Sequence, residues 1–327
     1  MSRILITGGA GFIGSYIARE LVEKGEDVFL FDSFVRYSYP LDRNEFDYRR
    51  IRLSGLQDRV RIFRGDTRHL GVFRRAVLKC KPEIIVHTAA LPIAAISDYH
   101  AEEAVDSTVK GTVNVLEVIR DVGFVKRLVY TSSSMVYGDF QYDPADEEHP
   151  KNPTGVYGGA KLAGEILTQA YSRRFGTQYT IIRPSAVYGP TDSNRRVSQI
   201  FVEKALRGVP LRLDGGGKDR LDFSYVKDVA RGFVLAMFSP RAVNEVFNIT
   251  RGEGRSLREF AQILSEMIPG VTMEIGPADE HRPKRGALDI SKARELLGYN
   301  PEYSLEKGLE EYVAFVREHM MHERRGS

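Results

Sequence analysis

The chain has 327 residues, 42% hydrophobic and 28% charged, which is long enough for one large domain or two moderate ones. Its 47 basic and 44 acidic residues leave a net charge of +3, and the lack of a dense basic cluster argues against nucleic-acid binding. A single cysteine excludes an intrachain disulfide, no apolar run approaches the roughly 20 residues of a membrane span, and the N-terminus has no secretory signal pattern. We therefore expect a cytoplasmic protein with no nucleic-acid partner and no membrane partner.

Short apolar runs alternate with amphipathic segments over residues 1–183. We predict buried strands at 4–6, 28–31, 61–63, 84–87, 128–130 and 180–182, and helices at 12–24, 68–80, 101–121 and 157–175. Because strands and helices alternate, the fold class is α/β, with a parallel sheet that helices cover on both sides. Right-handed crossovers then make it a doubly wound Rossmann sheet.

The composition changes after residue 183. Residues 184–220 are rich in Gly, Pro, Asn and Arg around one helix near 196–207, and 222–238 resemble a strand followed by a helix. Another strand and two or three helices follow within 245–320. We expect one domain from 1–183 and roughly 222–248, and a smaller α+β lobe from 184–221 and 249–327.

A glycine-rich turn, TGGAGFIG, follows the first predicted strand and opens the first helix. Gly8, Gly11 and Gly14 would let backbone N–H groups approach a pyrophosphate at the positive end of that helix. Asp32 ends the second strand 18 residues past Gly14, where a carboxylate can bind an adenosine ribose and would repel a 2′-phosphate. The pattern predicts a dinucleotide site and favours NAD over NADP, although Arg36 is near.

Two further strand ends would face the same site, because ligands bind at the carboxyl ends of strands in an open α/β sheet. Asp66, in the sequence GDT, could contact the adenine amino group. Ala89 and Ala90, in HTAA, are small enough to let a cofactor lie over the strand end.

Tyr157 and Lys161 are four residues apart and would share one helix face. A tyrosine with its ordinary pKa near 10 is a poor base at neutral pH, and we expect the lysine cation and a nicotinamide ring to lower that pKa. Ser133 follows a predicted strand 24 residues before Tyr157 and could hydrogen-bond the same substrate hydroxyl.

The motifs TGGAGFIG, GDT, HTAA, SSSMVYG, YGGAK and RPSAVYGP occur in order along the chain. In them the chain resembles the extended short-chain dehydrogenases/reductases, the NAD-dependent nucleotide-sugar epimerases and dehydratases, over essentially its whole length. The resemblance implies that Ser133 and Tyr157 are catalytic, that Tyr157 is the general base and acid, and that Lys161 activates it. It also implies that a sugar hydroxyl is oxidised by hydride transfer to NAD, giving a keto-sugar that an epimerase reduces again on its other face.

The resemblance implies an NAD-binding domain and a substrate-binding lobe, with contacts from both. The expected NAD contacts are Gly8, Gly11, Phe12, Ile13, Gly14, Asp32, Ser33, Asp66, Thr67, Thr88, Ala89, Ala90, Thr131, Tyr157, Lys161 and Pro184. The expected substrate contacts are Leu91, Pro92, Ser134, Met135, Ser185, Ala186, Asn194, Arg195, Arg196, Arg220 and Arg282.

Ser134 and Met135 bear on the type of reaction. Family dehydratases and decarboxylases usually carry an acidic residue at one or both of the positions after the catalytic Ser/Thr, since water elimination needs a proton donor and a base. Neither Ser134 nor Met135 can act as a carboxylic acid. The stretch therefore favours an epimerase, most simply a 4-epimerase of a UDP-sugar or UDP-uronic acid that passes through a 4-keto intermediate.

Three positions depart from the family pattern. Leu221 stands where an arginine usually binds the diphosphate, Ala186 where many relatives have Asn, and Thr108 where Asn is common. Arg220 could substitute after a local shift. Arg195, Arg196, Arg282 and Arg285 are further candidate cations. Of these, Arg196 and Arg282 are our preferred phosphate ligands, with Arg195 or Arg196 able to meet a sugar carboxylate instead.

Other interpretations stay open at this point. A nucleotide-sugar dehydratase or reductase is the nearest alternative to the epimerase, and a non-catalytic NAD-binding protein is a more distant one. His87 and His281 have no second metal ligand at useful spacing, so we expect no zinc site, and we expect His87 to be a packed strand-end residue. The resemblance further implies a homodimer in which helices 101–121 and 157–175 form a four-helix bundle.

Overall fold

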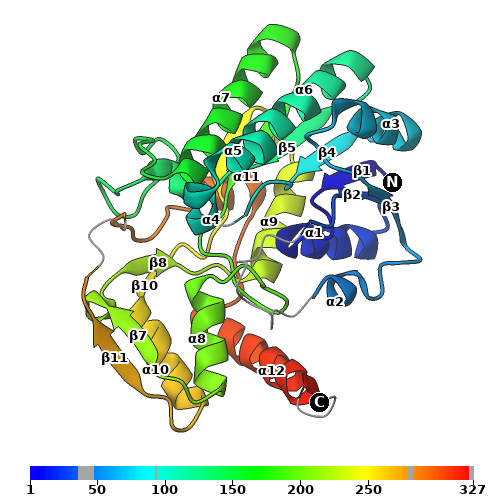
Figure 1. The fold of residues 1–327 in the computed structure, drawn as a ribbon. Helices are drawn as coiled ribbons and strands as arrows, with labels where there is room; N and C mark the ends of the chain where they lie inside the picture. The colour runs from blue at the N-terminus through cyan, green and yellow to red at the C-terminus, as the bar shows by residue number, and fades with distance from the viewer. Residues whose placement is uncertain (36–47, 93, 279–282, 324–327) are drawn as a thin grey trace.

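The computed structural model describes residues 1–35, 48–92, 94–278 and 283–323. Its centre is a seven-stranded parallel sheet in the order β3-β2-β1-β4-β5-β6-β9 (Figure 1). The strands are β1 (Arg3–Thr7), β2 (Asp27–Asp32), β3 (Val60–Arg64), β4 (Ile84–His87), β5 (Arg127–Thr131), β6 (Tyr179–Arg183) and β9 (Glu245–Asn248). The predicted doubly wound α/β fold is confirmed, and all six predicted strands lie in this sheet.

Helices cover both faces of the sheet (Figure 1). Ile4 and Ile6 of β1 pack with α1 (Phe12–Glu23) and α9 (Val226–Phe238), whereas Leu5 points to the core formed with α3 (Leu70–Cys80) and α6 (Gly111–Val122). Because successive side chains of a strand point to opposite faces, a strand that is covered on both sides must be apolar throughout. The remaining elements around the sheet are α2 (Arg49–Leu53), α4 (Ala94–Tyr99), α5 (Ala101–Val105), η1 (Asp106–Lys110), η2 (Ser134–Tyr137), α7 (Val156–Phe175), η4 (Pro240–Ala242) and α11 (Ser291–Leu297).

Three elements differ from the sequence prediction. β3 lies at the edge of the sheet and exposes part of its surface, so it is not covered on both faces. The helix expected over 101–121 is interrupted by one π-helical turn, η1, between α5 and α6. The strand expected at 222 is β8 (Arg220–Asp222), which pairs with β10 (Gly254–Ser256) outside the central sheet.

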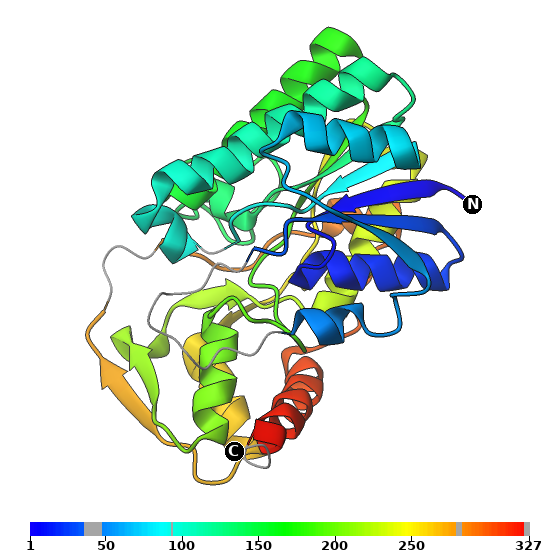
Figure 2. The same ribbon diagram turned by 45° about the vertical axis from the view of Figure 1, so that its right-hand side comes forward.

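A second group of elements packs around its own hydrophobic core below the sheet (Figures 1 and 2). Besides β8 and β10 it contains α8 (Val197–Leu206), β7 (Leu211–Asp214), η3 (Gly215–Gly217), α10 (Leu257–Met267), β11 (Met273–Gly276) and α12 (Leu305–Glu323). Ala293 and Leu297 of α11 do not belong to this second core but pack into the core beside the sheet. Among the described residues, no helix is long and apolar enough to cross a membrane.

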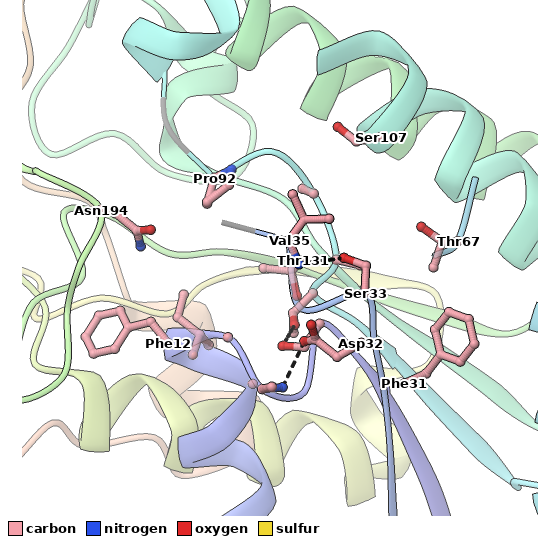
Figure 3. Close-up of a pocket in the computed structure, with 18 of the residues that line it drawn as sticks. Phe12, Phe31, Asp32, Ser33, Val35, Thr67, Pro92, Ser107, Thr131 and Asn194 are labelled. Atoms are coloured by element: carbon pink, nitrogen blue, oxygen red, sulfur yellow. Dashed lines mark hydrogen bonds between the residues drawn. The ribbon is translucent and has the colours of Figure 1, made fainter. Parts of the chain in front are cut away.

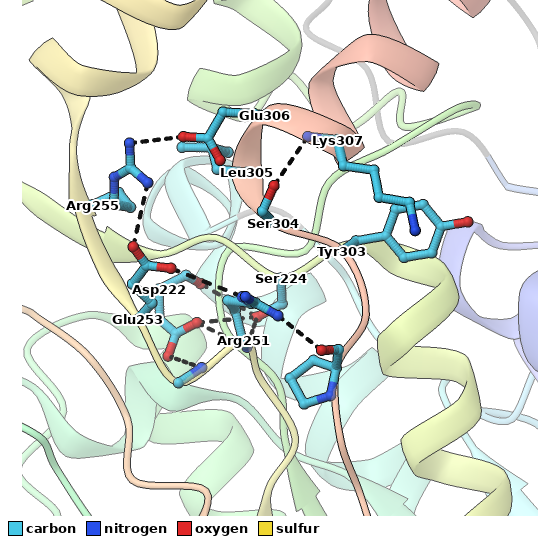
Figure 4. Close-up of polar contacts among 12 residues, drawn as sticks. Asp222, Ser224, Arg251, Glu253, Arg255, Tyr303, Ser304, Leu305, Glu306 and Lys307 are labelled. Carbon is cyan, nitrogen blue, oxygen red and sulfur yellow. Dashed lines mark hydrogen bonds and ion pairs between the residues drawn. The ribbon is translucent and has the colours of Figure 1, made fainter.

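Polar contacts join β8, β10 and α12 to one another and to the segment that follows β9 (Figure 4). Arg255 donates from Nη2 to Glu306 at the start of α12 over 3.0 Å, and Arg251 donates from Nη1 to the carbonyl of Pro301 over 2.8 Å. The buried carboxylate of Asp222 accepts from the backbone N–H of Arg251, 3.0 Å away. The segments after β9 are therefore fixed against β8 and α12.

Candidate active site

A cavity opens at the carboxyl ends of the central strands, where an open α/β sheet binds its ligands. Figure 3 shows Asp32, Ser33, Thr67, Thr131 and Asn194 around it. Most of the expected NAD contacts line this cavity, namely Gly8, Gly11, Phe12, Ile13, Gly14, Asp32, Ser33, Asp66, Thr67, Thr88, Ala89, Ala90, Thr131, Tyr157 and Lys161. Pro184 does not line it.

The glycine-rich turn leaves no room for side chains. A Cβ on Gly14 would lie 2.4 Å from the carbonyl oxygen of Gly8, and one on Gly8 would lie 2.8 Å from Oγ1 of Thr88. Gly8 also has a φ of 69°, a conformation that glycine adopts without strain. The start of α1 is thereby packed closely onto β1 and β4, as a pyrophosphate-binding turn requires.

Two carboxylates of the cavity wall lie at the ends of the neighbouring strands β2 and β3. Asp32 accepts hydrogen bonds from the N–H groups of Ala10 at 2.9 Å and Phe34 at 2.7 Å, and burial raises its pKa against the effect of these donors. Asp66 is bound by the guanidinium of Arg68, with Nη2 at 2.8 Å. Burial opposes the charged form of Asp66, but Arg68 lowers its pKa overall. Arg36, the residue considered for a 2′-phosphate, lies outside the described residues.

Of the three expected catalytic residues, Tyr157 and Lys161 line the cavity, whereas Ser133 lies outside its lining and hydrogen-bonds Tyr157. Ser133 follows β5 and caps η2, accepting from the N–H of Met135 at 3.2 Å, while Tyr157 and Lys161 project from the first turns of α7. The Lys161 ammonium donates to the carbonyl of Thr131 over 2.8 Å and lies 5.9 Å from the centre of the Tyr157 ring. The fold thus brings together residues from β5 and α7.

Two neighbouring groups act on the pKa of Tyr157. Burial raises this pKa, and the Arg196 guanidinium and the hydroxyl of Ser133 oppose the rise. Burial also lowers the pKa of Lys161 to about 7, against the attraction of Glu165. Arg196, which was expected to meet the substrate, thus also favours the ionised form of Tyr157.

Behind the catalytic residues lies a buried ion pair that the sequence analysis missed. Glu165, one turn after Lys161, accepts from Arg183 at 2.9 Å and 2.7 Å, and it also binds the hydroxyl of Ser132. Arg183 in turn donates to the hydroxyl of Tyr137 over 2.9 Å. The pair ties α7 to β5 and β6, and a glutamate four residues after the YxxxK lysine was its only sequence signal.

His87 is a packed strand-end residue, as predicted, with 1% of its surface exposed. Its Nδ1 lies 2.7 Å from Oγ1 of Thr7, and its Nε2 lies 3.1 Å from Oγ1 of Thr112. Since the Thr112 hydroxyl already donates to the carbonyl of Thr108, it must accept from Nε2, and His87 is a neutral ring protonated there. Among the described residues, no three His, Cys, Asp or Glu side chains gather as a metal site.

The expected substrate residues divide into several groups. Pro92, Asn194 and Arg196 line the cavity. Ser134, Met135 and Ser185 lie outside its lining but all contact Arg285, which the sequence analysis left out of the expected contacts. The structure also adds Ser107, Arg49 and Arg52 to the cavity wall, and the π-helical turn η1 contains Ser107.

Four more expected substrate residues also lie outside the cavity lining, and a fifth lies outside the described residues. Leu91 is fully buried in a cluster with Ile96 and Ala104, so its side chain has no surface for a ligand. Arg220 donates to the carbonyl of Gly254 in the second group of elements. The other three are Ala186, which has a positive φ of 35°, Arg195, which is exposed, and Arg282, which lies outside the described residues.

Comparison with known proteins adds to this geometry. Residues 4–250 match the model of the NAD dependent epimerase/dehydratase family. The chain is 32% identical to a putative UDP-glucose 4-epimerase of Methanocaldococcus jannaschii, over 96% of this chain and 98% of that protein. It is 31% identical to UDP-glucuronic acid decarboxylase 1 of Arabidopsis thaliana, over 99% of this chain and 72% of that protein.

Among solved structures, the fold is similar to that of UDP-glucuronic acid 4-epimerase from Bacillus cereus in complex with UDP-glucuronic acid and NAD. The TM-score is 0.87 at 27% identity, and the match covers 97% of this chain and 99% of that one.

Proposed function

Because the chain belongs to the NAD dependent epimerase/dehydratase family, we propose that it is a 4-epimerase of a UDP-sugar or UDP-uronic acid. The observation that carries this proposal is the meeting of Ser133, Tyr157 and Lys161 beside two residues, Ser134 and Met135, that hold no carboxyl group. The epimerase names of similar proteins support the same conclusion.

The cavity fits NAD. The close approach of Gly14 to Gly8 leaves backbone exposed where a pyrophosphate would lie, and Asp32 offers a carboxylate at the ribose position. Thr67, Ala89 and Thr131 would line the rest of the cofactor, ending at Tyr157 and Lys161. When bound, NAD accepts a hydride from the sugar carbon and returns it.

The chain's own residues handle the proton. In the proposed reaction Tyr157 takes the proton of the sugar 4-hydroxyl as a 4-keto sugar forms, and it returns that proton when the hydroxyl is restored on the opposite face. Ser133 hydrogen-bonds the same oxygen and, with Arg196, favours the tyrosinate that this step needs. Lys161 donates to the carbonyl of Thr131, and this hydrogen bond fixes its ammonium group next to Tyr157.

A dehydratase would eliminate water from the same 4-keto sugar, and a decarboxylase would remove CO₂ from it. Water elimination needs a proton donor and a base near the sugar, and the positions next to Ser133 supply neither. The thioether of Met135 and the hydroxyl of Ser134 do not titrate in the neutral range. The lack of a carboxyl group at these two positions favours the proposed epimerase over a dehydratase.

The test is to incubate the protein in deuterated water with UDP-, dTDP-, GDP- and CDP-sugars and to analyse products by mass spectrometry and NMR. A 4-epimerase gives an isomer with no deuterium in the ring. A product lighter by one water that carries solvent deuterium would establish a dehydratase, and a pentose product would establish a decarboxylase.

We also propose that the protein is a homodimer that pairs through α6 and α7. Supporting this, α5, α6 and α7 pack side by side on one face, and they expose Val105 (47%), Ile166 (54%) and Phe175 (46%). Exposed apolar side chains on adjacent helices are typical of a covered surface. The cytoplasm is the proposed location, supported by the free thiol of Cys80.

A further inference from the structure

Arg285 is half-buried and contacts the two residues that directly follow the expected catalytic Ser133. Its Nη1 is 3.1 Å from the sulfur of Met135, and its Nη2 is 3.2 Å from the hydroxyl of Ser185 and also bonds that of Ser134. Ser134 and Met135 directly follow Ser133, and Ser185 comes two residues after β6. The guanidinium therefore borders the place where the sugar must meet Ser133.

The guanidinium of Arg285 has only neutral partners. In the described parts of the chain no carboxylate forms an ion pair with it, and its Nε is buried without a hydrogen-bond partner. Asp222 attracts it from a distance, but that carboxylate already accepts from Thr250, Gly252 and Leu288. A half-buried cation without a paired anion has lost part of its hydration, so this arrangement favours an anionic ligand.

The backbone around Arg285 is fixed on both sides. The N–H of Lys284 donates to Asp139 over 2.7 Å, and its carbonyl accepts from Phe140 over 2.8 Å. On the other side, the N–H of Ala287 donates to Asp143 over 2.9 Å. The arginine is thus held in place before any ligand binds, as a recognition residue should be.

Chemistry and position together select the ligand. A planar guanidinium flanked by two hydroxyl donors suits a carboxylate or a phosphate oxygen pair. In a hexuronic acid the carboxylate is attached to C5, the neighbour of the carbon whose hydroxyl Ser133 and Tyr157 would handle. We propose that Arg285, with Ser134 and Ser185, binds the C6 carboxylate of the sugar, so that the preferred substrate is a UDP-hexuronic acid. This inference rests on the proposed 4-epimerase function.

The first test measures binding, which does not depend on turnover. Calorimetry on the NAD-loaded wild-type protein should show UDP-glucuronate binding about 10-fold or more tighter than UDP-glucose, the gain expected of a charge-assisted hydrogen bond. Arg285→Met should abolish this preference, whereas the affinity for UDP itself should stay within about twofold. Equal binding of the two sugar nucleotides by the wild-type protein would overturn the proposal.

A second test compares activities of the same variant. Arg285→Met should lose about 100-fold in kcat/KM for UDP-glucuronate and little for UDP-glucose. Equal losses for both sugars, accompanied by weaker UDP binding, would show that Arg285 holds the diphosphate instead. Arg285→Lys keeps the positive charge but not the two parallel donors of the guanidinium, and it replaces the Met variant if that variant does not fold. It should keep only part of the preference for UDP-glucuronate. If no sugar is epimerised but the binding preference and its loss are both seen, the carboxylate site stands and the proposed reaction fails.

Discussion

Single residues decide the chemistry of this site, and Tyr157 is the clearest case. Its hydroxyl lies where burial raises its pKa, and Arg196 and Ser133 work against that rise. A base in such a place is tuned by neighbours from other segments, not by its own helix alone. The residue-scale predictions therefore concern proton positions.

Tyr157→Phe should lower kcat by about 100- to 10,000-fold, the usual contribution of general acid–base catalysis. The ring still packs in the cavity wall, so bound NAD and the affinity for UDP-sugar should be unchanged. Steady-state kinetics and cofactor content of the purified variant check this. Wild-type activity in Tyr157→Phe would contradict the assigned mechanism.

The neutral ring of His87 should make stability depend on pH. Burial lowers the pKa of His87 to about 3 from an ordinary value of 6.5. Between these values the unfolded state binds a proton that the folded state does not, so stability is full above pH 6.5 and falls by about 1.4 kcal/mol per unit below it. Denaturant unfolding at pH 7.5 and 5 measures this loss.

His87→Gln is the matched control, because a glutamine amide can accept from Thr7 and donate to Thr112 without titrating. The variant should lose less stability than the wild-type protein between pH 7.5 and 5. An identical pH dependence in both proteins would mean that His87 does not titrate as described.

At the scale of elements, α7 carries Tyr157 and Lys161, the proposed catalytic tyrosine and lysine, so its position against β5 and η2 matters. Two contacts set the position of α7. The Glu165–Arg183 pair holds its middle, and Gly158 lets its first turn lie against the carbonyl of Met135. A shift of α7 away from η2 would separate Tyr157 from Ser133. The small size of Gly158 therefore helps to set the position of the helix.

The neighbouring glycines of α7 provide a sharp test. A Cβ on Gly158 would lie 2.6 Å from the Met135 carbonyl oxygen, whereas one on Gly159 meets nothing within 4 Å. Gly159→Ala should raise the free energy of unfolding by about 0.5–1 kcal/mol with unchanged activity. Gly158→Ala should lower it by about 1–3 kcal/mol and reduce kcat.

Chemical denaturation measures the free energy of unfolding of both variants, and steady-state kinetics measures their kcat. If Gly158→Ala is as stable and as active as Gly159→Ala, then the approach of α7 to η2 does not position Tyr157.

At the scale of the whole molecule, the cavity lies at the carboxyl ends of the strands, while Arg196 and Arg285 come from segments after β6. Arg196 directly precedes α8 of the second group of elements, and Arg285 lies between β11 and α11. The cavity wall is therefore completed by Arg196 where the second group meets the carboxyl ends of the strands.

The proposed dimer predicts a mass twice the 36.9 kDa of the chain in sedimentation experiments. Ile166→Glu places a charge on the exposed face of α7 and should shift the protein to monomer. Ile275→Glu, at a 74% exposed site on β11, should leave the dimer intact. A monomeric wild-type protein would refute the proposed pairing.

The sequence by itself determined six strands of the sheet, their parallel direction and the position of the glycine-rich turn, because these depend on local patterns. Apolar runs of strand length, a glycine turn between strand and helix, and YxxxK on one helix face each follow from neighbouring residues. The predicted Ser133, Tyr157 and Lys161 meet for the same reason, since parallel strands end at one edge. At 101–121 the helix was predicted without its π-helical turn, and at 222 the strand was predicted without its pairing outside the central sheet.

Only the tertiary structure decided which charged side chains face the site. Arg282 was the preferred ligand and Arg220 a possible replacement cation, yet Arg285 contacts Ser134 and Arg220 binds Gly254. The charge partners of Tyr157, and the Glu165–Arg183 pair, likewise join segments far apart in the chain. Arginine side chains are long and solvated by default, so their direction depends on packing between distant segments, which no local pattern records.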